Sequence, residues 1–240
     1  MKIRRLPETD LARFAVMTPD KRRAALERHK TSYAPYSYNP MRGVIPAIFD
    51  IEVPLLGRPL GYSWEVISGI IATCSKRSDA ERTANLLVGE LLFKFSKEHG
   101  VKGRGQDFYA MPVGMATAIR FWSPVVIAVD GKPVVPFIDP RKAHSLDAKA
   151  RRFVLSVMHE RIRVLDPDYR EVGLGIFQFP IDGKGRKVKF YTDESVDLYD
   201  FETLDLMVRE TYEMWREVLA EREEKKRRGG GTGTYGPLFD

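Results

Sequence analysis

Carboxylates near the end of one apolar run are the residues of this chain best suited to chemistry. Asp139 directly follows the β-rich run 134–138, and Arg141 and Lys142 stand close behind it. Glu90 falls on the helix expected over residues 78–99 and is a second acid that such a site could use. Carboxylates that converge on one Mg²⁺ or Mn²⁺ ion can activate water for phosphodiester hydrolysis, and a nearby cation can stabilise the attacking water. Acids and cations of these types could form such a metal site if the fold brought them together.

Basic residues form a second candidate site, for a polyanion. Lys and Arg exceed Asp and Glu by 39 to 33 in the whole chain, by nine to four in residues 1–30 and by seven to two in residues 141–163. A basic surface attracts nucleic acid because each neutralised phosphate releases counterions. A solvated helix face has the same composition. The expected nucleic-acid contacts lie in the second basic stretch and in a glycine-containing loop, and they are Arg151, Arg152, Lys184, Arg186 and Lys187.

Two segments have the composition of protein-docking peptides. Residues 31–62 interleave tyrosines and prolines, and residues 229–234 form a Gly-rich linker before the last six residues, Tyr-Gly-Pro-Leu-Phe-Asp. Leu238 and Phe239 in this tail resemble the end of peptides that dock on bacterial sliding clamps, although the glutamine that normally begins those peptides is missing. A tail without a role has the same composition.

Periodicity and capping signals predict the elements that must position these residues. Ser78 followed by Glu81 is a capping box, which starts a helix that Gly100 ends. Asp130-Gly131 predicts a type I′ hairpin in which residue 129 pairs with residue 132. Further helices are expected within 8–30, over about 146–165 and near 201–228, and strands over 44–53 and around a second hairpin at 182–186. Cys74 lies in an apolar stretch and is expected to be buried.

These elements predict an α+β or α/β fold: a mixed sheet of about five to six strands flanked by helices, with a helical N-terminus and a long C-terminal helix. The expected division is an N-terminal extension over residues 1–62, a core domain over 63–228 and a flexible tail over 229–240.

The composition excludes several classes of protein. A single cysteine excludes an intrachain disulfide, no apolar run reaches the length of a membrane span, and the first residues lack a secretory signal, so a cytoplasmic protein is expected.

The order of helix, strands, hairpin, long helix and strand over residues 78–180 resembles the PD-(D/E)xK nuclease-like (restriction-endonuclease-like) superfamily. That resemblance implies a metal site built from a strand Asp and a following (Asp/Glu)-x-Lys, and Asp139-Pro-Arg-Lys142 stands where the second motif would fall. For an active enzyme, the resemblance implies a catalytic set of Glu90, Asp139, Arg141 and Lys142, with Asp139 as the metal ligand. The lysine is one place late, Arg141 occupies its position, and residues 122–124 contain no acid. The hairpin must also lie in the middle of the sheet for residues 139–142 to reach a basic rim.

Three functions remain open on this basis. The leading interpretation is a nucleic-acid-associated protein of nuclease-like architecture whose metal site has degenerated. The alternatives are a protein-interaction or assembly factor that docks through the Pro/Tyr segment and the tail, and an active divalent-metal phosphodiesterase. Only the last requires a cofactor, Mg²⁺ or Mn²⁺. The expected partners are nucleic acid and a protein bound through the tail, no membrane is expected, and the apolar helices leave a homodimer open.

Overall fold

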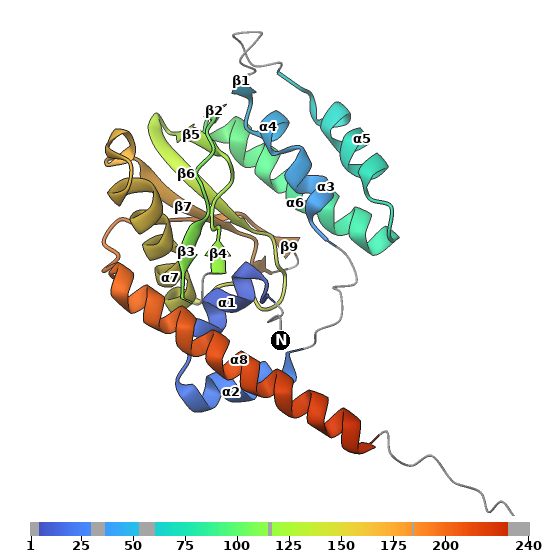
Figure 1. Cartoon of the computed structure of the whole chain (residues 1–240). Helices are drawn as coiled ribbons and strands as arrows, with labels where there is room; N and C mark the ends of the chain where they lie inside the picture. The colour runs from blue at the N-terminus through green and yellow to red at the C-terminus, as the bar shows by residue number, and fades with distance from the viewer. Residues whose placement is uncertain (1–4, 30–36, 53–60, 115–116, 184, 230–240) are drawn as a thin grey trace, which may run out of the picture.

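A mixed six-stranded sheet runs through the middle of the computed structural model (Figure 1). The structure describes residues 5–29, 37–52, 61–114, 117–183 and 185–229. In spatial order the strands are β1 (Ile51–Glu52), β2 (Lys102–Gly105), β5 (Val125–Val129), β6 (Lys132–Asp139), β7 (Gly173–Gln178) and β10 (Lys189–Thr192).

Helices cover both faces of this sheet, and two short hairpins lie outside it. The helices are α1 (Glu8–Ala15), α2 (Pro19–Arg28), α3 (Asn39–Gly43), α4 (Ile45–Ile48), α5 (Trp64–Cys74), α6 (Asp79–Glu98), α7 (Ala148–Met158) and α8 (Phe201–Gly229). The hairpins are β3 (Met111–Val113) with β4 (Thr117–Ile119), and β8 (Ile181–Asp182) with β9 (Gly185–Arg186). The predicted fold class, with its mixed sheet and long C-terminal helix, is confirmed. The division into extension, core and tail stays a prediction.

The central hairpin has the geometry that its turn residues predict. Asp130 and Gly131 both have positive φ, 49° and 79°, as a type I′ turn requires, and Val129 pairs with Lys132. β5 and β6 occupy the third and fourth places of the six-stranded sheet, so the hairpin lies mid-sheet as expected. From β6 the chain crosses through α7 and returns as β7, which pairs with β6 in parallel.

Two hydrophobic cores lie on opposite faces of the sheet. Side chains alternate between the faces because successive residues of a strand point in opposite directions. In β6, Val135 and Phe137 join the core under α1, α2, α7 and α8, whereas Val134 and Ile138 join the core under α3, α4, α5 and α6. Both faces of the central strands are therefore covered, as their nearly continuous apolar sequences predict.

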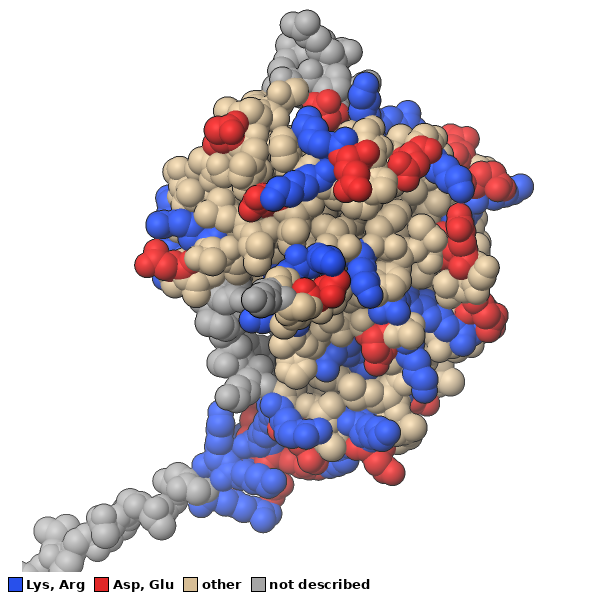
Figure 2. All heavy atoms as spheres, turned by 180° about the vertical axis from the view of Figure 1, so that it is seen from behind, with Lys and Arg blue, Asp and Glu red and all other residues tan. Residues whose placement is uncertain are grey.

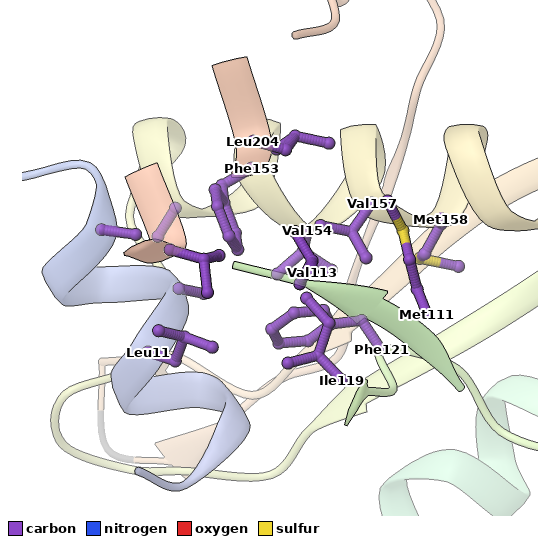
Figure 3. Close-up of a cluster of buried hydrophobic side chains, with 14 of the residues drawn as sticks. Leu11, Met111, Val113, Ile119, Phe121, Phe153, Val154, Val157, Met158 and Leu204 are labelled. Atoms are coloured by element: carbon purple, nitrogen blue, oxygen red, sulfur yellow. The ribbon is translucent and has the colours of Figure 1, made fainter. Parts of the chain in front are cut away.

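The β3–β4 hairpin fills the space between the helices of the first core. Figure 3 shows Met111, Val113 and Ile119 pointing among side chains from α1, α7 and α8. All three are at most 3% exposed. Gly114 lies at the end of β3 with φ of +62°, and its N–H donates to Asp205 of α8 over 2.6 Å. The hairpin thus ties α8 to the rest of this layer.

Two local expectations are wrong. Residues 44–53 do not form a strand: α4 occupies Ile45–Ile48, and only Ile51–Glu52 pair with the sheet. Pro46 lies in the first turn of α4, where a missing N–H is tolerated. Cys74 is exposed because it ends α5 at the surface. The long helix expected over about 146–165 is present: α7 continues after Met158 as a π-helical turn, His159–Val164.

Among the described residues, no helix combines the length and the apolar character that a membrane crossing requires.

Two glycines of β2 give a matched test of the sheet edge. A Cβ on Gly103 would lie 2.5 Å from the Val126 carbonyl oxygen and 2.8 Å from Ile51 Cδ1, whereas a Cβ on Gly105 would meet nothing within 4 Å. We expect Gly103→Ala to lower the free energy of unfolding by about 1–3 kcal/mol through overpacking. Gly105→Ala should stay within about 0.5 kcal/mol of the parent. Urea unfolding followed by circular dichroism measures both, and equal effects would contradict the described β1–β2–β5 packing.

Candidate functional site

Asp139 is enclosed by the protein at the end of β6. It is 0% exposed, and its Oδ2 accepts hydrogen bonds from Leu146 N at 2.9 Å and from Gln178 Nε2 at 3.0 Å. Its Oδ1 accepts from Arg141 N at 3.4 Å. The carboxylate therefore closes the loop between β6 and α7 onto the neighbouring strand. This role satisfies a buried charge through hydrogen bonds.

The other members of the candidate catalytic set have partners of their own. Glu90 accepts a hydrogen bond from Lys94 Nζ at 2.6 Å, one turn further along α6. Arg141 Nη1 lies 2.6 Å from Asp10 Oδ1 of α1, and Lys142 is exposed. Within the described residues, no group of three or more His, Cys, Asp or Glu side chains is arranged to hold a metal ion. The contacts do not join the four residues into one site.

Two of the arginines expected to contact nucleic acid instead stack on aromatic rings within the chain. The guanidinium of Arg151 lies 3.9 Å from the ring centre of Tyr191, and that of Arg152 lies 3.8 Å from the ring centre of Tyr199. Arg152 also pairs with Asp197 at 2.6 Å. These contacts attach α7 to β10 and to the segment between β10 and α8. Stacking of this kind stabilises a cation through the electrons of the ring.

The basic hairpin loop is also engaged internally. Arg186 donates to the carbonyl oxygens of Pro140 and Phe179 at 2.7 and 2.8 Å, so it connects β9 to the ends of β6 and β7. Lys187 pairs with Asp182 at 2.8 Å. Lys184 lies outside the described residues.

The N-terminal basic stretch faces acids of α8. Arg22 is 5% exposed, and it pairs with Glu210 at 2.9 Å and donates to the carbonyl oxygens of Ala15 and Met17. Arg23 pairs with Glu217 at 3.1 Å. These ion pairs hold α2 against α8. Figure 2 shows acidic and basic side chains interspersed over the visible face, with basic ones gathered where the last turns of α8 project.

Hydrogen bonds hold the first described residues of the Pro/Tyr segment against α6. The Glu81 carboxylate accepts from Ser37 N at 3.0 Å and from Arg77 N at 3.1 Å. Asn85, one turn further along α6, accepts from Met41 N at 3.0 Å and donates to the Ser37 carbonyl at 2.8 Å. Both side chains are buried. The capping prediction is thus right for Ser78, which accepts from Glu81 N, but the Glu81 carboxylate binds residues 37 and 77.

The same segment is held at two further points, which bracket residues 53–60. Ile51 and Glu52 pair in parallel with Gly103 and Arg104 at the edge of the sheet. Asp50, which has a positive φ of 51°, accepts from Gly61 N at 3.2 Å. The two ends of this stretch are therefore brought together beside an edge strand. The docking residues expected in the tail, Leu238 and Phe239, lie outside the described residues.

Sequence reasoning missed the roles of Asp50, Glu81 and Asn85. Aspartate tolerates the left-handed conformation better than most residues, so Asp50 before a short strand is a turn signal that could have been found. Ser37 lies 44 residues from Glu81 and Met41 lies 44 residues from Asn85, and no local pattern indicates these partners.

Substitution of Asp139 tests whether this residue is structural. Asp139→Ala leaves the buried Leu146 N–H and the Gln178 amide without their acceptor, so we expect the free energy of unfolding to fall by about 2–4 kcal/mol. Asp139→Asn keeps one acceptor oxygen and should lose less. Calorimetry with and without Mn²⁺ measures both properties. A Mn²⁺-dependent rise in the Tm that Asp139→Asn removes would contradict the structural role.

The Glu81 carboxylate predicts a specific pH dependence. Hydrogen bonds from the Ser37 and Arg77 backbone lower the pKa of Glu81 against the opposing effect of burial. A carboxyl whose pKa is lower in the folded state stabilises the protein above its unfolded pKa and loses that contribution as the pH falls through its folded pKa. We expect Glu81→Gln to be less stable at neutral pH and to lose less stability below about pH 4. Glu90→Gln, on the exposed side of the same helix, is the matched control, and identical profiles for the two variants would refute the assignment.

Comparison with known proteins shows where this chain belongs. Residues 9–225 match a family described as "Sliding clamp-binding bacterial toxin SocB". A protein of Caulobacter vibrioides (strain NA1000 / CB15N), the "DNA replication inhibitor toxin SocB", is 35% identical over 242 residues, which cover 100% of this chain and 99% of that protein. No solved structure matches.

These matches overturn the leading functional interpretation. The family is described as clamp-binding toxins and the Caulobacter protein as a DNA replication inhibitor toxin, and neither description points to a DNA-binding protein of nuclease-like architecture or to a phosphodiesterase. The alternative of a protein-interaction factor agrees better with them. The resemblance to the PD-(D/E)xK superfamily finds no support in either match. The family match spans most of the chain, and the Caulobacter protein is similar from end to end, so the chain belongs to the SocB family.

Proposed function

We propose that this chain binds the bacterial sliding clamp and thereby inhibits DNA replication. The observation that carries the proposal is membership of a family described as clamp-binding toxins, together with a relative described as a DNA replication inhibitor. The internal engagement of Arg22, Arg151, Arg152 and Arg186 supports a protein partner, because these cations already have acceptors within the chain.

Residues 53–60 of the Pro/Tyr segment are the favoured docking peptide. Their sequence, Val-Pro-Leu-Leu-Gly-Arg-Pro-Leu, offers three leucines for an apolar groove, and two prolines reduce the conformational entropy lost on binding. Ile51, just before this peptide, pairs in parallel with Gly103, and Gly61, just after it, donates to Asp50. The family match includes this segment but ends at residue 225, before the tail.

Inhibition of replication then follows because the chain competes with other proteins for the clamp. A chain that occupies the peptide-docking groove of the clamp denies that groove to other proteins that need it. The tail peptide with Leu238 and Phe239 is the second candidate for this contact, because of its resemblance to clamp-docking peptides.

Paired alanine variants distinguish the two segments. We expect the full chain to bind purified clamp in titration calorimetry, and Leu55→Ala with Leu56→Ala to weaken that affinity by roughly 10- to 100-fold, as loss of a buried apolar anchor does. Leu238→Ala with Phe239→Ala should have a smaller effect. Val164→Ala with Leu165→Ala removes exposed apolar side chains elsewhere and serves as the control.

Clamp-dependent DNA synthesis in vitro should respond in the same order as the affinities. Full-chain protein that does not bind the clamp would refute the proposed function. Loss of binding only in the Leu238/Phe239 variant would place the contact in the tail and refute the assignment to residues 53–60.

A further inference from the structure

The outer side of α5 is an apolar helix face that no described element covers. Val66 and Ile70, one turn apart, are 47% and 41% exposed, and Tyr62 just before the helix is 37% exposed. The opposite side of the helix packs on α6 through Ile67 and Ile71, both 0% exposed. Figure 1 shows α5 as the outermost helix on its side of the molecule. Both sides of the helix are therefore apolar, and only one of them is used inside the chain.

The centre of this outer face is occupied by a glycine, and the space above it is open. Gly69 lies between Val66 and Ile70, and a Cβ built on it would meet nothing within 4 Å. A second helix could approach the backbone closely at this point, and the apolar side chains on either side would then pack around the crossing.

A hollow of about 420 Å³ continues the face at the C-terminal end of α5. Ile70 and Cys74 line it together with Val44, and Lys76 and Arg77 stand among its polar lining residues. The structure records no ion pair for the side chains of these two cations within the described residues. The hollow offers space for an apolar or aromatic side chain and charge for an acidic one.

The two ends of this face carry opposite charges. Glu65 is exposed in the first turn of α5, and Lys76 and Arg77 are exposed just beyond its last turn. A helix laid antiparallel across the face would meet complementary charges at both ends only if it carried an acid near its start and cations near its end. The α5 helix of a second copy of this chain has that arrangement.

We propose that this protein forms a homodimer in which two α5 helices pack antiparallel about Gly69 and Ile70. A two-fold axis makes such an interface self-complementary, since each contact occurs twice. Glu65 of each copy then lies opposite the Cys74–Arg77 end of the other, and Tyr62 of each copy lies beside the other's hollow. The antiparallel helix dipoles add a favourable contribution. This proposal is independent of the clamp-binding segment.

Sedimentation velocity over a concentration series tests the apolar part of the interface. We expect the wild-type chain to dimerise and Ile70→Glu to raise the dimer dissociation constant by at least roughly tenfold, because a buried charge would face its own copy. Leu165→Glu is the matched control, because Leu165 is also an exposed apolar side chain, at 63%, but lies just after the π-helical turn, away from α5. A wild-type chain that stays monomeric, or a dimer that Ile70→Glu leaves unchanged, would overturn the proposal.

Charge exchange tests the orientation. Glu65→Lys alone, and Lys76→Glu with Arg77→Glu, should each weaken dimerisation, and the three changes together should restore it. Because the triple variant keeps every local loss of the single ones, recovery reports the intermolecular contact. Weakening without recovery would contradict the antiparallel arrangement.

The lone cysteine gives a second orientation test. Antiparallel pairing keeps the two Cys74 Cα atoms roughly 16 Å apart, from a rise of about 1.5 Å per residue and a helix separation of about 9 Å. A disulfide needs Cα atoms within about 7 Å. Mild oxidation of the dimer should therefore give no covalent dimer, and rapid cross-linking through Cys74 would overturn the arrangement.

Discussion

The parallel pairing of β6 with β7 is the constraint on which the rest of the structure depends. Six consecutive residue pairs, from Val134 with Gly173 to Asp139 with Gln178, hold these strands together at the centre of the sheet. Parallel neighbours need a crossover connection, which α7 provides, and both faces must be covered because their side chains are apolar on each side. The two helical layers and both cores follow from that requirement.

Asp139 makes structural contacts at a position where the sequence suggested a catalytic residue. A carboxylate at the end of a central strand, followed by cations, is the arrangement that a metal-dependent nuclease uses. Here the carboxylate accepts hydrogen bonds from Leu146 and Gln178, and it sets the position from which α7 starts. The sequence around Asp139 follows the nuclease pattern only in part, and the buried donors that face its carboxylate favour the structural role.

The sequence predicted those features that depend on neighbouring residues. The Asp130-Gly131 turn, the Ser78 cap and the long helices are local, and the structure contains them. The strand expected over residues 44–53 was wrong because Pro46 and burial against α6 favour a helical turn there. The internal partners of the basic stretches could not be predicted for a related reason: Arg22 and its partner Glu210 are 188 residues apart, and no local pattern reveals such a pair. The clamp partner was inferred only weakly, from a tail that the family match does not include.

The ion pair between Arg22 of α2 and Glu210 of α8 has a consequence for how this chain folds during its synthesis. Arg22 is synthesised 188 residues before Glu210, the acid of α8 that pairs with it. Until α8 has left the exit tunnel, the guanidinium lacks its partner Glu210 and α2 lacks the helix on which it packs. Folding of this layer therefore waits until α8 has been synthesised, and a polypeptide that stops before α8 cannot complete it.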